Sequence, residues 1–214
     1  MAKIVVFGAG GKAGRRVVAE AVERGHQVTA VVREPAKHAR LEGAGVNLVA
    51  GDVTDAASVA SAAAGHDAAV STVFRPDADP GEFYTEAAEA LVAGLAEAGV
   101  QRVVTVGVGT ALEVAPGVAV HDTEQFPAEY KGFSVGHSSE IAILGASGLD
   151  WVVVTPPPAV LDDEAERTGS YRSGGTQVLP AHEGAPAFSY ADLAVALVDE
   201  AAEGKYHREV VAVG

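Results

Sequence analysis

A short apolar run that leads directly into a cluster of glycines constrains this chain more than any other feature. The run spans Lys3–Phe7, at the start of KIVVFGAGGKAGRR. The seven residues that follow it, 8–14, include Gly8, Gly10, Gly11 and Gly14. A tight turn needs one or two glycines, so this density indicates a backbone that a ligand or another segment approaches closely. The sequence therefore predicts a strand, a sharp turn and a helix at the start of the chain.

Short apolar runs alternate with helical patterns along the rest of the chain. Most runs are continuous Val and Ile without alternation, as in strands buried on both faces of a parallel sheet. The predicted strands are Lys3–Phe7, Gln27–Val32, Val46–Ala50, Arg102–Val106, Glu209–Val213 and residues 68–73 and 151–155. The predicted helices span residues 12–24, 56–64, 82–98, 139–146 and 189–199, the last opened by a capping box at Ser189.

This alternation predicts an α/β fold: a doubly wound, Rossmann-type, mostly parallel sheet with helices on both faces. We expect residues 1–214 to form one domain with a small C-terminal appendage on the substrate side. Two long connections, residues 107–137 and 155–188, follow the carboxyl ends of strands and are expected to form the walls of a substrate cleft. The second is predicted to contain a hairpin about Gly174 and Gly175.

Composition narrows the classes of partner. The net charge of −14 argues against a general nucleic-acid binder. The absence of a signal-peptide pattern and of any apolar stretch of about 18 residues predicts a cytoplasmic protein without membrane contact. With no cysteine and no metal-like spacing among its histidines, we expect no metal site. The expected partner is a small-molecule substrate, and the protein is expected to be a monomer or homodimer.

The glycine cluster fits two forms of the dinucleotide-binding fingerprint. One is Gly8-x-Gly10-x-x-Ala13, and the other is Gly8-x-x-Gly11-x-x-Gly14. In both, the first glycine turns out of the strand and the second lets the backbone approach a pyrophosphate at the helix N-terminus. The third lets helix and strand pack closely. Lys12 is expected to add to the field around the phosphates, with a solvated helix surface as the alternative.

The end of the second strand predicts which dinucleotide is bound. A carboxylate there would hold the ribose hydroxyl of NAD, but this chain places Arg33 in that position, with Lys37 one turn later. A guanidinium binds a 2′-phosphate well, so NADP is favoured, with NADPH preferred over NADH and the neighbouring Glu34 as the counter-argument. Further cofactor contacts are expected from Asp52 and Val53 at the adenine and from Ser71, Thr72 and Val73 along the ribose. Alternatively, Asp52 or Thr54 caps the following helix.

The motifs together resemble the atypical short-chain dehydrogenase/reductases, in particular NmrA-like and NADH–flavin reductase members similar to biliverdin-IXβ reductase. The resemblance covers nearly the whole chain through VFGAGGKAG, VVRE, GDVTD, RVVTVGVGTALEVAPG, FPAEYK, LDWVVVTPPPAV, RTGSYRSGG and SYADLAVALVDE. It implies an NAD(P)H-dependent oxidoreductase. It also implies a nicotinamide pocket lined by Gly107, Val108, Thr155, Pro156 and Pro157.

The usual catalytic pair of the superfamily, Tyr-x-x-x-Lys, is absent, because no tyrosine has a lysine four residues later. Hydride transfer to a flat conjugated acceptor such as a quinone, FMN or FAD does not need that pair. The candidates for a proton or hydrogen-bond donor are Thr110, Tyr130 and His137. Loop packing is the alternative role for Tyr130, and a surface position or helix cap is the alternative for His137. Two other functions stay open: an NADP-binding redox sensor without turnover, and a nucleotide-sugar epimerase-like enzyme.

Overall fold

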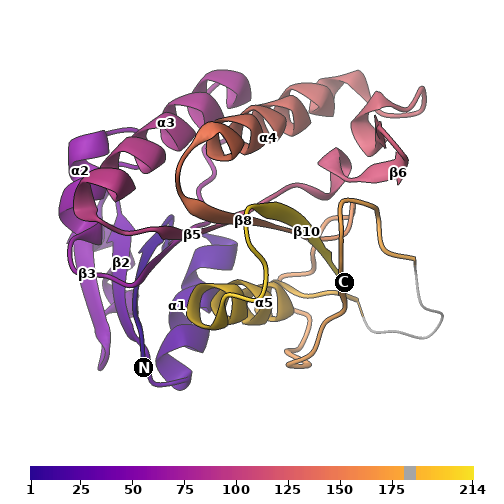
Figure 1. Ribbon diagram of the computed structural model, residues 1–214. Helices are drawn as coiled ribbons and strands as arrows, with labels where there is room; N and C mark the ends of the chain where they lie inside the picture. The colour runs from indigo at the N-terminus through magenta and orange to yellow at the C-terminus, as the bar shows by residue number, and fades with distance from the viewer. Residues whose placement is uncertain (181–186) are drawn as a thin grey trace.

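The computed structural model describes residues 1–180 and 187–214, which form a layered α/β fold (Figure 1). Its main sheet has the strand order β3-β2-β1-β4-β5-β8-β10-β9, and every pairing is parallel except that of β9. The strands are β1 (Lys3–Phe7), β2 (Gln27–Val32), β3 (Val46–Ala50), β4 (Ala68–Ser71), β5 (Arg102–Val106), β8 (Asp150–Thr155), β9 (Ser173–Gly174) and β10 (Glu209–Val213). This arrangement confirms the predicted doubly wound sheet.

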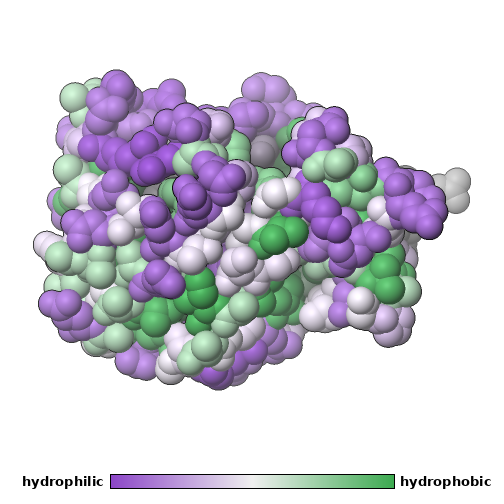
Figure 2. All heavy atoms as spheres, turned by 90° about the horizontal axis from the view of Figure 1, so that it is seen from above, coloured by the Kyte–Doolittle hydropathy of each residue, from purple (hydrophilic) through white to green (hydrophobic). Residues whose placement is uncertain are grey.

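Helices cover both faces of the sheet, as Figure 1 shows. On one face lie α1 (Lys12–Glu23) and α5 (Tyr190–Glu203), and on the other lie α2 (Ala56–Ala63), α3 (Pro80–Ala98) and α4 (Ala128–Ala146). Alternate residues of β1 enter two separate apolar cores, Ile4 and Val6 on the α1 side and Val5 and Phe7 on the α3 side. Burial on both faces explains the unbroken Val and Ile runs. Seen from above, the surface is largely hydrophilic with small apolar patches (Figure 2).

Helix boundaries follow the capping signals. The hydroxyl of Ser189 accepts a hydrogen bond from the backbone N–H of Asp192 at 2.9 Å, which confirms the predicted capping box of α5. Asp79 caps α3 through the N–H of Glu82. Asp55 caps α2 through the N–H of Ala57, so the alternative role of Asp52 or Thr54 as the cap is wrong.

The expectation that residues 107–137 form one long loop is wrong in its last third, because α4 already begins at Ala128. Its first turns are rich in small and polar residues and carry little apolar periodicity. Tertiary packing stabilises them instead: a Cβ on Gly136 would lie 2.7 Å from the backbone oxygen of Pro80, so glycine there lets α4 approach α3 closely. The remaining part of the loop contains a small hairpin of β6 (Glu113–Ala115) and β7 (Val118–Ala119).

The predicted hairpin about Gly174 and Gly175 is also wrong. Ser173 and Gly174 instead pair antiparallel with β10, because that strand leaves an open sheet edge beside them. The chain then runs to β6, where the N–H of Glu113 donates to the oxygen of Thr176 and the N–H of Val178 donates to the oxygen of Glu113. The two connections after β5 and β8 therefore contact each other. Residues 181–186 of the predicted 155–188 wall lie outside the described residues.

Glu20 joins α1 to the connection after β8. Its buried carboxylate accepts hydrogen bonds from Arg167 at 2.8 and 2.9 Å and from Arg24 at 2.7 Å. The hydrogen bond from Arg167, joined by those from Arg24 and opposed by burial, lowers the pKa of Glu20. A carboxyl whose pKa is lowered by folding stabilises the folded state above its unfolded pKa, and this contribution is lost as the pH falls through the folded pKa.

We therefore expect Glu20→Gln to lower the free energy of unfolding at pH 7 by about 1–3 kcal/mol, because charge-assisted bonds to two arginines become neutral ones. The difference from the wild type should shrink as the pH falls below about 4.3, where the unfolded-state glutamate takes up a proton, and should go on shrinking down to the lower pKa of the folded state. Urea unfolding at several pH values measures this. Glu23→Gln, an exposed change on the same helix, serves as the control and should stay within about 0.5 kcal/mol of the wild type. An equal effect of both changes would contradict the role of Glu20.

Candidate functional site

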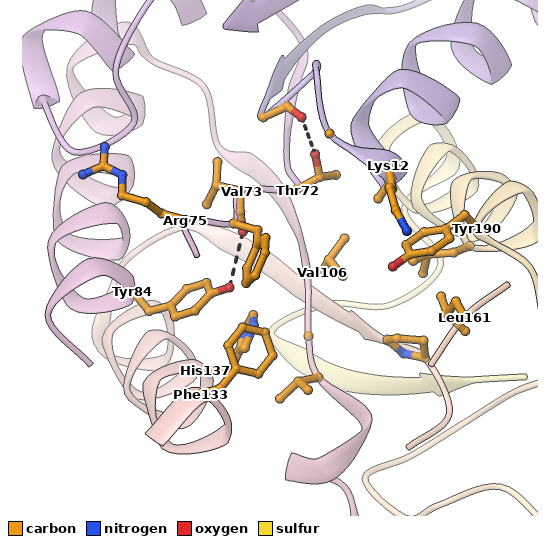
Figure 3. A pocket seen from close by; sticks show the side chains of 18 of the residues that line it. Lys12, Thr72, Val73, Arg75, Tyr84, Val106, Phe133, His137, Leu161 and Tyr190 are labelled. Carbon is orange, nitrogen blue, oxygen red and sulfur yellow. Dashed lines mark hydrogen bonds between the residues drawn. The ribbon is translucent and has the colours of Figure 1, made fainter. Parts of the chain in front are cut away.

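A cavity of about 1040 Å³ opens at the carboxyl ends of the parallel strands. It starts at the glycine loop after β1, crosses the ends of β4 and β5, and reaches α4 and the connection after β8 (Figure 3). The sheet order reverses between β1 and β4, and ligands of open α/β sheets bind in the crevice at such a switch point. A single ligand pocket typically measures about 300–1,000 Å³, so this cavity is at the upper limit for one ligand.

The glycine loop keeps the switch point open. Gly8 has a φ of +77°, and a Cβ there would lie 2.9 Å from the backbone of Thr72. The Thr72 hydroxyl donates to the oxygens of Phe7 and Gly8 at 3.1 and 3.2 Å, which joins the ends of β1 and β4. Gly14 does not line the cavity: it packs against the loop, where a Cβ would collide with the oxygen of Gly8. Its place matches the helix–strand contact expected of the third glycine.

The N-terminus of α1 faces the cavity without a side-chain cap. Gly11 is the N-cap residue, and neither a capping side chain nor an acidic residue occupies the first turn. Gly11, Lys12 and Ala13 line the cavity, and a Cβ on Gly11 would meet nothing closer than the oxygen of Gly8 at 3.4 Å. Unsatisfied N–H groups and the helix dipole make such an end a ready site for an anion. The loop therefore fits a pyrophosphate.

The adenosine end of the cavity is expected near β2 and β3. Arg33 is exposed there and lines the cavity together with Gly10, Asp52 and Val53. The ring of His38, which the sequence did not single out, lies directly over Gly10, and its Nδ1 has no partner in the described part of the chain. Lys37 does not line the cavity, because its ammonium group pairs with Glu34 at 2.7 Å. That pairing leaves Arg33 as the cation at the end of β2.

Asp52 is held in a tight local turn. Its carboxylate accepts hydrogen bonds from the N–H and hydroxyl of Thr54 at 3.0 and 2.8 Å, and Arg75 lies 3.8 Å away. Burial opposes its ionisation, but the hydrogen bonds from Thr54 and the charges of Arg75 and Arg33 outweigh this effect and lower the pKa of Asp52. An ionised acceptor therefore stands beside two cations at this end of the cavity.

Asp163, from the connection after β8, was not anticipated. Its carboxylate pairs with Arg15 at 2.8 Å, with Arg16 at 2.7 Å and with Lys12 at 3.9 Å. Partial desolvation opposes ionisation, but the hydrogen bond from Arg15 and the charges of Arg16 and Lys12 lower the pKa of Asp163. Lys12 therefore lines the cavity and also lies near Asp163. Together, Lys12, Arg15 and Arg16 hold the connection after β8 against the first turns of α1.

The other end of the cavity lies where β5 and β8 end. Gly107, Val108, Pro156 and Pro157 line it as expected. Two predicted contacts do not: Ser71 is 2% and Thr155 is 1% exposed, and both hydroxyls are enclosed within the sheet. A Cβ on Gly107 would collide with the Thr155 hydroxyl, and one on Gly109 would collide with the backbone of Pro157. Glycine at both positions lets the two connections meet at the bottom of the cavity.

Aromatic side chains from three segments gather beside this end (Figure 3). Phe74 follows β4 and is 62% exposed, and its ring meets that of Phe133 edge-on with centroids 5.7 Å apart. Tyr84 from α3 lies against Phe133 and His137 of α4, at 5.8 and 4.0 Å. Of these side chains, only His137 was singled out from the sequence. The cluster provides an aromatic, apolar wall suited to a conjugated ring system.

All three predicted donor candidates line the cavity. The hydroxyl of Thr110 shares a short hydrogen bond with Ser134 of α4. Tyr130 lies in the first turn of α4 and is 61% exposed, whereas its neighbour Lys131 pairs with Asp122. His137 is 5% exposed and pairs with the buried Glu140 at 3.0 Å, so its alternative as a surface histidine or helix cap is wrong.

Residues 8–203 match the sequence model of an NAD(P)H-binding family. The chain belongs to this family. This match agrees with the resemblance to the atypical short-chain dehydrogenase/reductases that the sequence motifs carry.

Solved structures of similar proteins share the entire fold. A protein from Burkholderia pseudomallei described as a "putative exported protein" is 39% identical, with a TM-score of 0.86 and complete coverage of both chains. A "putative epimerase" from Bacteroides thetaiotaomicron is 28% identical, with a TM-score of 0.87 over 100% of this chain and 96% of the other. A "putative NADH-flavin reductase" from Streptococcus pneumoniae is 28% identical, with a TM-score of 0.85 over 100% and 99%.

Within residues 1–180 and 187–214, no helix is both long and apolar enough to cross a bilayer. Over the same residues, no three His, Asp or Glu side chains are grouped so that they could hold a metal ion. The family membership and the cavity point to chemistry that a nicotinamide dinucleotide supplies.

Proposed function

We propose that this protein is an NADPH-dependent reductase that transfers hydride to a flat conjugated acceptor such as a quinone or flavin. The single observation that carries the proposal is one continuous cavity with two different ends. One end has an uncapped helix N-terminus and Arg33, which suit phosphates. The other end has an aromatic wall, which suits a planar ring.

The chain's residues have separate roles in this proposal. The first turn of α1 binds the pyrophosphate, and Arg33 binds the 2′-phosphate. Gly107, Val108, Pro156 and Pro157 shape the site for the nicotinamide, which supplies the hydride when bound. Phe74 and Phe133 orient the acceptor ring against it. The family match and the flavin-reductase name of the Streptococcus relative support the same reading.

A spectrophotometric assay tests the proposal. Purified protein with NADPH and either 1,4-naphthoquinone or FMN should oxidise NADPH well above the background rate, and faster than NADH at equal low concentration. Phe133→Ala should raise KM for the quinone while leaving the Kd for NADPH unchanged, because it removes part of the acceptor wall and no contact at the phosphate end of the cavity. A protein that binds NADPH but oxidises none with either acceptor would contradict the reductase assignment.

That same outcome would favour the second candidate, an NADP-binding redox sensor, which the absence of a Tyr-x-x-x-Lys pair also fits. The Bacteroides relative is described as an epimerase, but this chain offers no tyrosine–lysine pair for that reaction. The cytoplasmic location stays a prediction, since the Burkholderia relative is described as exported.

A further inference from the structure

A buried acid–imidazole pair lies beside Tyr84 and Phe133 of the aromatic wall. Nδ1 of His137 lies 3.0 Å from Oε2 of Glu140, and the two residues are only 5% and 4% exposed. Both belong to α4, one turn apart, so the helix itself sets their spacing. Neither residue belongs to the two apolar cores of the fold.

The ring of His137 is fixed from three sides. Tyr84 lies against one face with ring centroids 4.0 Å apart and an angle of 36°, and Phe133 meets it edge-on at 5.0 Å. Glu140 holds Nδ1. Figure 3 shows His137, Tyr84 and Phe133 converging on the cavity from α3 and α4. This packing leaves the imidazole one orientation, which is the condition for a positioned catalytic group.

The second ring nitrogen is open to the cavity. Among the described residues, Nε2 of His137 makes no hydrogen bond. It is also absent from the fully enclosed side-chain atoms that lack a partner, so part of this nitrogen is accessible. Since His137 lines the cavity, Nε2 is the atom that a ligand can reach. A carboxylate accepts hydrogen bonds and cannot donate them, so Glu140 fixes the proton of the neutral ring on Nδ1 and stabilises the ring when Nε2 is protonated too.

The neighbouring titratable group does not compete for this role. Among the described residues, Tyr84 of α3 and Glu140 of α4 are the titratable groups packed against His137. The Tyr84 hydroxyl donates to the oxygen of Val73 at 3.4 Å. Burial, with a contribution from Glu140, raises the pKa of Tyr84, which keeps its proton through the physiological range.

We propose that His137 is the catalytic proton donor of this site and that Glu140 is its positioning residue, with a quinoid or enone carbonyl compound as the acceptor class. This proposal rests on the reductase function proposed above. The acceptor gains a hydride from the nicotinamide, and its displaced π electron pair moves onto the carbonyl oxygen. That oxygen takes the proton from Nε2, and the neutral imidazole regains a proton from water. The sum is acceptor, NADPH and one proton giving reduced acceptor and NADP⁺.

The spacing on α4 supports this assignment. Phe133 and His137 are four residues apart and in contact, which is the spacing of the Tyr-x-x-x-Lys pair that the chain lacks. The phenyl ring of Phe133 provides a surface for stacking and has no acidic proton. The imidazole of His137 can donate the proton that a tyrosine donates in the usual pair. Stacking of the flat acceptor and proton transfer to it are thus assigned to two different residues, Phe133 and His137.

Steady-state kinetics with NADPH and 1,4-naphthoquinone, and with an enone such as 2-cyclohexenone, test the assignment. His137→Gln should lower kcat about 100-fold or more and remove its decline at alkaline pH, with the Kd for NADPH unchanged. Glu140→Gln should lower kcat about 10-fold or more at nearly unchanged KM, and Glu140→Asp should recover part of the loss. Ser139→Ala, on the same helix and outside the cavity lining, is the matched control.

A measurement without cofactor keeps the assignment testable independently of turnover. Nitrogen-15 NMR of the ligand-free protein should show the neutral His137 ring protonated on Nδ1, and Glu140→Gln should produce a mixture of tautomers. If the wild type turns over and His137→Gln retains its kcat and pH profile, the proton-donor proposal is overturned while the reductase function stands. If the wild type binds NADPH without turnover, the reductase function itself fails. A tautomer that Glu140→Gln leaves unchanged overturns the role of Glu140.

Discussion

Replacing Gly11 with valine is expected to abolish binding of both NADPH and NADH while the protein still folds. Gly11 has an extended backbone, with φ of −75° and ψ of 178°, which any residue adopts, and a Cβ there has room in the ligand-free protein. The same Cβ would stand where the pyrophosphate meets the helix amides. We expect a loss of affinity of more than about 100-fold, or about 2.7 kcal/mol. Isothermal titration calorimetry measures it, and circular dichroism checks the fold.

Two other glycines provide controls. Gly14→Val should prevent folding or greatly destabilise the protein, because its side chain would collide with the carbonyl of Gly8. Gly148→Ala, at an exposed position with nothing within 4 Å, should leave both binding and stability unchanged. A folded Gly11→Val protein that binds NADPH with wild-type affinity would show that the dinucleotide does not use the N-terminus of α1.

Replacing Arg33 with alanine is expected to reverse the preference between the two dinucleotides. The guanidinium lines the cavity at the end of β2, and Lys37 is occupied by Glu34. Loss of a charge-assisted contact to the 2′-phosphate should weaken NADPH binding by about 1.5–3 kcal/mol, or about 10-fold to 100-fold. NADH lacks this phosphate, so its Kd should stay within about twofold. Parallel titrations with both dinucleotides give the ratio.

Lys37→Ala is the matched control, since it removes an equal charge from the same segment outside the cavity lining. It should change the NADPH affinity little at moderate salt, where distant charges are screened. If Arg33→Ala weakens the binding of NADPH and NADH equally, or changes the binding of neither, the assignment of the 2′-phosphate to Arg33 is incorrect. His38, with its unpartnered Nδ1 over Gly10, would then be the first residue to test.

Local patterns were enough to predict the sheet. Strands buried on both faces are continuous Val and Ile runs, and the predicted ends of β1, β2, β3, β5 and β10 agree with the structure. The fingerprint glycines could be placed for the same reason, because their spacing reflects one turn and one helix start. The helix α4 was missed over its first turns, since Gly132, Ser134 and Gly136 disfavour helix in isolation and packing on α3 stabilises it.

Contacts between distant segments could not be predicted at either end of the site. Asp163 and Arg15 are 148 residues apart, and no local spacing signals their pairing. Tyr84 and His137 come from different helices that only the folded sheet brings together. The His137-x-x-Glu140 spacing can be read from the sequence, but only burial distinguishes a positioned pair from two surface side chains. The sequence did not indicate that burial, because His137 was placed at the end of a predicted loop.

The two ends of the cavity come largely from different parts of the chain. Residues 7–53 supply the glycine loop and Arg33, whereas the donor candidates and the proline run come from residues 107–161. Many substitutions in the second set can therefore leave the contacts of the first set in place. Among relatives that keep the same sheet, substitutions after β5 and β8 would give new substrate ranges while the shared coenzyme is retained. Diversity of chemistry on this scaffold should thus be concentrated in its second half.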